Sequence, residues 1–292
     1  MKKSQKFTYL IILLIIFLTL MGCAQQFKMI SPPIEAPIMK YIMPENEMLT
    51  YRIESDFLEK MKVQGKKVTN ITQKDMIVSF KTVEKAEDVY LLKGIMQFVA
   101  IKFSNTYIGE DWADTKNLQK KTFLMTLDEY GDEGELVGND DLIYNINRIG
   151  EQSLAPDFVD FFPDLPGRPL HVGESWTETD TLDLSDHGVH TQLVNKNKNK
   201  LAGYALIRDH ECAMIKVEYL GLLKSINYSE GEEYITTAEI KGTYTWFFDY
   251  QRGQFVRMIS EGEGKGESVP QGRVQETVPI TQEYYLEVNL DD

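Results

Sequence analysis

Two histidines and two aspartates form the cluster of side chains with the widest chemical repertoire in this sequence. Asp183, Asp186, His187 and His190 lie within eight positions, and carboxylate and imidazole groups are common ligands of transition metals. A helix would place His187 and His190 on one face. Gly188 and the surrounding Ser and Asp residues instead predict a turn, in which spacing does not fix geometry. We therefore expect a solvated loop and assign no metal ligand.

An acidic turn is the second candidate for cation binding. Its carboxylates are Asp128, Glu129, Asp132, Glu133 and Glu135. Clustered oxygen ligands suit calcium, but the segment lacks the alternating ligands, the central glycine and the terminal glutamate of an EF-hand loop. A solvent-exposed hairpin turn is the favoured interpretation, and no cofactor is predicted.

Motifs for covalent catalysis are missing from the sequence. It contains no Gly-x-Ser-x-Gly elbow and no His-Glu-x-x-His segment. The run Gly262-Glu263-Gly264-Lys265-Gly266 lacks the spacing and the following Ser or Thr of a phosphate loop, so we expect a strand end or a bulge there. No catalytic residue is assigned, and an enzyme of unrecognised type is the least favoured of three functions considered.

The start of the chain resembles the signal of bacterial lipoproteins. Lys2, Lys3 and Lys6 precede an apolar run over residues 7–20, which is too short to span a bilayer comfortably. The run ends in Leu20-Met21-Gly22-Cys23, which resembles a lipobox. The resemblance implies that residues 1–22 are a cleaved signal peptide and that Cys23 is lipidated. It also implies a lipid-anchored protein of the bacterial cell envelope, in the outer membrane if the host has two membranes.

The only other cysteine is Cys212. A plain secretory signal would leave Cys23 free or paired with Cys212, whereas lipidation of Cys23 leaves Cys212 alone. We expect Cys212 to be a buried strand residue, because a free cysteine behaves as a small hydrophobic side chain.

The mature chain is strongly acidic. The formal charge of the whole chain is −14, and residues 1–22 carry three lysines and no acid, so the remainder carries −14 − 3 = −17. Such a surface argues against nucleic-acid binding. Residues 23–46 contain four prolines that interrupt any regular pattern, which predicts an extended spacer.

Alternating apolar and polar residues predict a mainly β body. Leu49, Tyr51 and Ile53 alternate with polar residues, and the same period of two recurs over residues 234–248 and 280–290. The pattern favours antiparallel strands, with a first β unit over residues 47–139 and a second over 171–292. Similar hairpins at residues 122–136 and 243–256 suggest an internal duplication.

A connector over residues 140–170 separates the two units. Leu142, Ile143, Ile146 and Ile149 have helical spacing, which predicts a short helix over residues 140–153. The following stretch combines four prolines with Phe158, Phe161, Phe162 and Leu165, and these apolar side chains must be covered.

A second resemblance lies where the later unit begins. The segment Val172-Gly173-Glu174-Ser175-Trp176 resembles one that opens the second half of uncharacterised bacterial lipoproteins. This resemblance implies a duplicated β-rich body and no known activity, so it assigns no site residue. Physically, Gly173 permits a tight strand entry and Trp176 is a large core anchor.

These observations favour a non-catalytic binding or structural module in the cell envelope. Its partners would be the membrane, through the lipid on Cys23, and envelope proteins, with no nucleic acid. The main alternative is a carrier of an apolar ligand such as a lipid, enclosed by a curved sheet. The side chains that motivate the carrier hypothesis are Met96, Met125, Met214, Met258, Phe98, Trp246 and Phe248.

Overall fold

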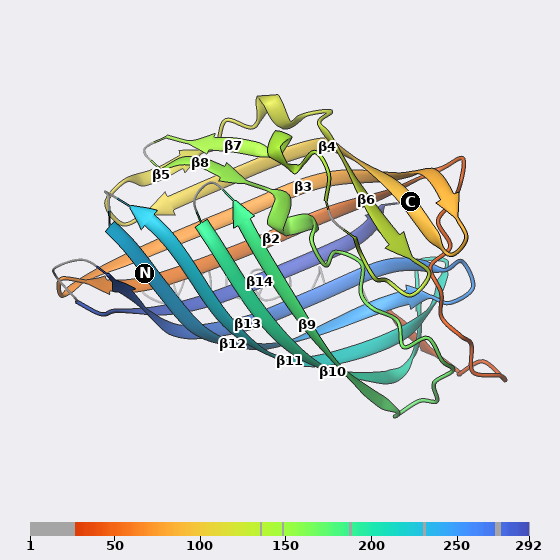
Figure 1. Ribbon diagram of the computed structural model, residues 1–292. Coiled ribbons are helices and arrows are strands. Elements are labelled where there is room, and N and C mark those ends of the chain that lie inside the picture. Colours follow the sequence, from red (N-terminus) through yellow and green to blue (C-terminus); the bar gives the residue numbers. More distant parts are fainter. Residues whose placement is uncertain are drawn as a thin grey trace, which may run out of the picture.

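One antiparallel sheet of twelve strands dominates the computed structural model. The model describes residues 27–291 apart from 135, 148, 187–188, 230–231 and 272–275. Figure 1 shows that the sheet is strongly curved and that the connector lies across one of its faces. The strands of this sheet are β1 (Lys28–Ile30), β2 (Met48–Val63), β3 (Lys66–Ala86), β4 (Val89–Asn105), β5 (Gly109–Trp112), β6 (Thr122–Asp128), β9 (Ser175–Asp186), β10 (Val189–Ile207), β11 (His210–Ser229), β12 (Glu232–Asp249), β13 (Gln254–Pro270) and β14 (Val278–Asp291).

The strands on the two sides of the connector belong to the same sheet. β2, β3 and β4 pair in sequence order, with β5 and β6 both paired to β4, and β9 to β14 also pair in sequence order. β14 then pairs with β2, from Ile280 opposite Met61 to Asp291 opposite Thr50. The predicted mainly β, antiparallel fold is confirmed.

The two faces of the sheet differ in what covers them. On β2 the side chains of Leu49, Tyr51 and Ile53 are buried, as their alternation predicts, and they lie on the face that the connector covers. We call this the inner face and the opposite one the outer face. Because strand side chains alternate, each strand contributes every second residue to the inner face.

Aromatic side chains of the connector form the centre of the core. Phe161 and Phe162 lie against Tyr51, with ring centroids 5.4 and 6.0 Å apart. Phe162 also contacts Phe80 at 5.1 Å, and Phe255 stacks on Tyr51 at 5.7 Å. Full burial of one such ring stabilises the fold by roughly 1.5–3 kcal/mol. The connector is therefore part of the core that both sets of strands share.

The prediction of a helix over residues 140–153 is wrong. The segment forms a hairpin of β7 (Ile143–Ile146) and β8 (Gly150–Ser153), preceded by the 3-10 turn η2 (Asn139–Asp141) and followed by η3 (Ala155–Phe158). The buried residues Leu142, Tyr144 and Ile146 repeat every second position, so the strand period prevailed over the helical one. A third 3-10 turn is η1 (Lys116–Leu118), and no helix among the described residues is long and apolar enough to cross a membrane.

The segment expected to be a spacer contacts the body in two places, whereas Ile34 between them is fully exposed. β1 pairs with β10, and the side chains of Met39, Tyr41 and Met43 are buried. The backbone N–H of Tyr41 donates to the carbonyl oxygen of Glu129 at 2.8 Å. Residues 27–46 are thus extended and contact the rest of the chain through β1 and through residues 39–43.

The segment that resembles other lipoproteins forms the entry into β9. Gly173 has a φ of +96°, a conformation that glycine adopts without strain. Its N–H donates to the carbonyl oxygen of Leu201 at 2.8 Å, which ties the start of β9 to β10. Trp176 is only partly buried at the edge of the core, and its indole N–H donates to the carboxylate of Glu178.

Candidate functional site

Three carboxylates of the predicted acidic turn, those of Asp128, Glu129 and Glu133, have hydrogen-bond partners within the chain. Asp128 accepts hydrogen bonds from the backbone N–H groups of Tyr130 and Asp132, at 2.7 and 2.9 Å, which stabilises the turn after β6. Glu129 pairs with Lys40 at 2.5 Å.

Glu133 from the same turn holds the connector in place. Its carboxylate accepts hydrogen bonds from the backbone N–H groups of Asp160 and Phe162, at 2.9 and 2.7 Å. Glu135 lies outside the described residues. Across the described part of the chain, no three acidic, His or Cys side chains are arranged to hold a metal ion.

The histidines lie in separate environments. His190 is 3.5 Å from Asp183, and both side chains are about half exposed. His187, the other histidine of that cluster, lies outside the described residues. His210 is buried beside Asp249, with 2.9 Å between Nδ1 and Oδ2. His210 begins β11 and Asp249 ends β12, beside the turn that leads into β13, and neither residue lines the cavity described below.

Cys212 is fully buried in β11, as predicted. Burial, together with the nearby Asp249 carboxylate, raises the pKa of its thiol. The thiol is therefore protonated at neutral pH and is a poor nucleophile.

The glycine-rich run lies in the middle of β13, so the predicted strand end or bulge is wrong. Residues 262–266 pair without interruption with β12 and β14. A Cβ atom at Gly262 would lie 2.1 Å from the Tyr219 hydroxyl and 2.4 Å from the Tyr284 hydroxyl. Glycine at this position lets both tyrosines lean across the inner face.

A cavity of about 240 Å³ lies between the inner face and the connector. The sheet residues that line it come from β9 to β14, and the connector residues come from positions 160–164. Its lining consists of Asp160, Phe161, Pro163, Asp164, Glu178, Asp180, Asn195, Asn197, Asn199, Tyr219, Tyr244, Trp246, Met258, Ser260, Tyr284 and Leu286. None of these described lining residues is Lys, Arg or His.

Register brings the polar part of this lining together. Glu178 and Asp180 are two positions apart on β9 and face the same side, where asparagines of β10 meet them. Asn199 donates to Glu178 at 2.8 Å, and Asn197 donates to Asp180 at 2.9 Å. These amide donors fix the orientation of both carboxylates. The sequence analysis did not identify these residues, although their alternation on neighbouring strands is visible in the sequence.

Two further carboxyl groups reach the cavity from the connector. Burial and the negative charges of Asp160, Glu178 and Asp180 raise the pKa of Asp164 to about 8. Desolvation by the surrounding protein, followed by the charge of Asp180, also raises the pKa of Asp160, although this residue remains exposed at the surface. Burial raises the pKa values of Glu178 and Asp180 despite their amide hydrogen bonds. Among the described residues, no basic side chain forms an ion pair with any of the four.

Tyrosine side chains form another wall of the cavity. The ring of Tyr219 lies 5.9 Å from that of Tyr244 and 6.2 Å from that of Tyr284, measured between centroids. Burial raises the pKa values of Tyr219 and Tyr244, so both hydroxyls are protonated at neutral pH. Within the described part of the chain, the buried Tyr219 hydroxyl has no hydrogen-bond partner.

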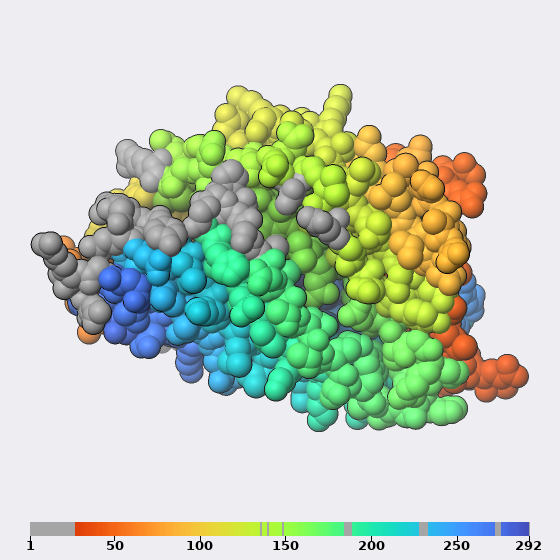
Figure 2. All heavy atoms as spheres, viewed as in Figure 1, coloured from red at the N-terminus to blue at the C-terminus, as the bar shows by residue number. Residues whose placement is uncertain are grey.

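The cavity continues into a groove along β9. This groove of about 510 Å³ shares Asp160, Asp164, Asp180 and Asn195 with the cavity, and it adds Asp132 from the turn after β6. Figure 2 shows the connector and the strands β9 and β10 side by side at the surface. The shared lining gives the cavity an acidic approach.

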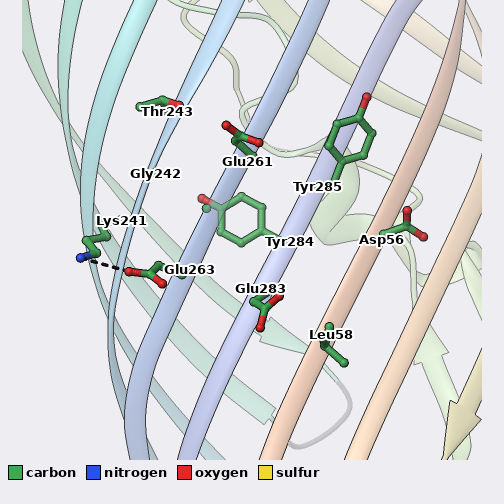
Figure 3. Close-up of a pocket in the computed structure, with 11 residues that line it drawn as sticks. Asp56, Leu58, Lys241, Gly242, Thr243, Glu261, Glu263, Glu283, Tyr284 and Tyr285 are labelled. Carbon is green, nitrogen blue, oxygen red and sulfur yellow. Dashed lines mark ion pairs between the residues drawn. The ribbon is translucent and has the colours of Figure 1, made fainter. Parts of the chain in front are cut away.

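A wider hollow lies on the outer face of the sheet. It has a volume of about 810 Å³ and is a shallow depression across β2, β12, β13 and β14 (Figure 3). Its charged side chains are exposed, and Lys241 pairs with Glu263 at 3.1 Å. Because exposed charges remain hydrated there, this depression offers a ligand less than the partly enclosed cavity does.

Most of the side chains behind the apolar-carrier hypothesis pack in the core. Met96, Met125 and Phe248 are almost completely buried, and Phe98 is 39% exposed. Of the residues named for that hypothesis, only Trp246 and Met258 border the cavity. The cavity is thus partly polar and acidic, which does not favour an acyl chain.

Comparisons with known proteins identify no family. No family model and no curated protein matches the sequence. Among solved structures, OccK2 (OpdF) of Pseudomonas aeruginosa is 8% identical and aligns over 85% of this chain and 99% of its own, with a TM-score of 0.25. OccD3 (OpdP) of Pseudomonas aeruginosa is 7% identical over 89% of this chain and 95% of its own, with a TM-score of 0.19. At these TM-scores the alignments show neither a shared fold nor a shared function.

Proposed function

We propose that this chain is a lipid-anchored cell-envelope protein that acts as a non-catalytic binding module, and that the inner-face cavity binds a small polar ligand. One observation carries the proposal. The cavity combines oriented carboxylates, amide groups and aromatic rings, and its described lining contains no basic residue. Binding sites typically combine apolar walls with a few placed polar groups.

Three acids of the cavity, Asp164, Glu178 and Asp180, are partly buried. Removing carboxylates from water without a partner destabilises a fold, and at Asp164 the penalty raises the pKa to about 8. Perturbed acids gathered in a concave site are a physical indication of function. The non-catalytic part of the proposal rests on the missing motifs for covalent catalysis.

The binding test uses the emission of Trp246. The chain has three tryptophans, so replacing Trp112 and Trp176 with Phe leaves only the one that borders the cavity. We expect a saturable change in emission with at least one class among diamines, sugars, amino acids and calcium. No response from any class, with calorimetry also negative, would contradict the proposal.

A matched pair of variants locates the binding. Asn195→Phe places a ring at the junction of the cavity and the groove, and we expect it to abolish the response. The control Lys196→Phe makes the same addition at the next residue, which is exposed on the outer face, and should leave the response unchanged. Equal effects of both variants would place the binding elsewhere.

The lipid anchor rests on the sequence, because Cys23 lies outside the described residues. We expect the protein to incorporate a palmitate analogue and to sediment with membranes in a bacterial host. Cys23→Ala should prevent the labelling and release the protein into the soluble fraction. A variant that still sediments with membranes would contradict lipid anchoring through Cys23.

A further inference from the structure

We propose that the ligand of the inner-face cavity is a linear polyamine, an aliphatic chain with two or more ammonium groups. This inference rests on the proposed function and specifies the class of ligand.

The described lining of the cavity contains carboxylates but no basic side chain that would compensate their negative charge. Two other partly buried carboxylates have a basic partner: Asp157 pairs with Lys74 at 2.6 Å, and Glu129 pairs with Lys40 at 2.5 Å. Asp160, Asp164, Glu178 and Asp180 form no ion pair with a described basic side chain. A cationic ligand would supply the compensation that the described protein does not.

The positions of the acids favour an organic cation over a metal ion. The acids are divided between the connector and β9, and no three of the described ones are arranged to hold one ion. A metal ion needs several oxygen ligands around a single point. Ammonium groups spaced along a chain instead need separate carboxylates, which this arrangement offers.

Apolar and aromatic side chains form part of the walls of the cavity. Phe161, Met258 and Leu286 line it together with the ring of Trp246. Methylene groups gain free energy by leaving water against such surfaces, and an ammonium group is attracted to an aromatic face. The ring of Tyr219 lines the same wall, but its unpartnered hydroxyl is shielded from solvent and would have to turn toward the cavity to accept a hydrogen bond from an ammonium N–H group.

The charge of the cavity also favours a polyamine over a neutral sugar. A sugar could use the asparagines and the aromatic rings, but it would leave the partly buried carboxylates of Asp164, Glu178 and Asp180 without a compensating charge. The acidic groove continues beyond the cavity to Asp132. An elongated ligand can therefore extend from the cavity along β9 with a carboxylate within reach along its length.

Proton release provides an independent signature of a cation. In the free protein Asp164 has a pKa of about 8, set by burial and by Asp160, Glu178, Asp180 and Asp132. A bound ammonium group favours the ionised form, so binding releases protons near neutral pH. The affinity should increase between pH 6 and pH 8, and the measured binding enthalpy should depend on the ionisation enthalpy of the buffer.

The experiment is calorimetric titration of spermidine into residues 23–292 with Cys23→Ser. We expect saturable binding that weakens with salt. Asp180→Asn keeps an acceptor for Asn197 and Asp164→Asn keeps the size of the side chain, and each should lower the affinity by about tenfold or more. The control Glu261→Gln changes the same charge on the outer face and should alter the affinity by less than about twofold.

The other outcomes separate this inference from the proposed function. Binding of glucose or calcium, but not of spermidine, overturns the polyamine assignment and leaves a binding module. Equal affinity for an uncharged diol of similar length does the same. An effect of Glu261→Gln as large as that of Asp180→Asn reduces the result to general charge attraction and overturns the assignment. Failure of all these probes, together with no response from Trp246, overturns both proposals.

Discussion

Asp164 illustrates at the scale of one residue how a site can oppose the stability of its own fold. Its carboxyl has an ordinary pKa of 3.8, raised to about 8 in the folded chain. Between these values the folded state binds the proton and the unfolded state does not. The free energy of unfolding therefore decreases as the pH increases from about 4 to about 8.

The variant Asp164→Asn removes this pH dependence. Near pH 4 we expect little change in stability, because the native carboxyl is protonated there. Near pH 8 the variant should be more stable by at least about 1 kcal/mol, which corresponds to roughly 2–4 °C in the melting temperature. Thermal melts at both pH values measure this, and an equal difference at pH 4 and pH 8 would contradict the assigned pKa.

Gly262 is a second residue whose identity the inner face dictates. In Gly262→Ala the methyl group would have to displace the hydroxyls of Tyr219 and Tyr284. We expect a loss of about 1–3 kcal/mol in urea unfolding. In the control Gly264→Ala, the nearest neighbours of the methyl group are Gln282 at 3.0 Å and Ile240 at 3.5 Å, so this substitution should cost less. Tyr219→Phe in the Gly262→Ala background should restore part of the loss, since it removes the nearest clashing atom.

At the scale of elements, the connector is attached to the sheet by a partly buried ion pair. Lys74 on β3 reaches both carboxylate oxygens of Asp157 in η3, at 2.8 and 2.6 Å. This contact and the two hydrogen bonds to Glu133 hold the connector where its aromatic rings enter the core.

Removing the carboxylate of Asp157 should lower the free energy of unfolding more than replacing Lys74 with an apolar side chain of similar size. Asp157→Ala leaves the Lys74 ammonium in a partly buried place without its partner, and we expect a loss of roughly 3 kcal/mol. Lys74→Met keeps the apolar volume and should lose less. Lys241→Met breaks the exposed pair with Glu263 and should change the stability by less than about 1 kcal/mol. Urea unfolding measures all three, and equal losses for the first two would contradict this account.

The elements differ in how far the sequence alone determines them. Strands such as β2 and β14 were predictable, because their alternation is local and strict. Residues 140–153 were mispredicted, because Leu142 and Ile146 satisfy both a helical and a strand period, and only contacts with the core decide between them. The cavity was missed for a different reason. Asp164, Asp180, Asn197 and Tyr219 meet through strand register and connector packing, which no short spacing encodes.

At the scale of the whole molecule, one core joins the strands on both sides of the connector. Tyr51 of β2, Phe161 of the connector and Phe255 of β13 are in mutual contact, and β14 pairs with β2 along most of its length. The division into two β units predicted from the sequence does not correspond to two separate cores among the described residues.

Thermal unfolding should therefore be a single cooperative transition. We expect the calorimetric enthalpy to equal the van't Hoff enthalpy for residues 23–292 with Cys23→Ser. Residues 47–139 expressed alone should not fold, since their core side chains would lose Phe161 and Phe255. Two resolved transitions, or a folded fragment, would show that the first unit is independent.

The path of the N-terminal segment also limits how the molecule can stand on a membrane. Phe27 contacts Phe247 on the outer face, with ring centroids 5.1 Å apart, and only four peptide units separate Phe27 from Cys23. Fully extended, they reach about 14 Å. A lipid on Cys23 would therefore keep the part of the outer face around Phe247 within that distance of the lipidated cysteine.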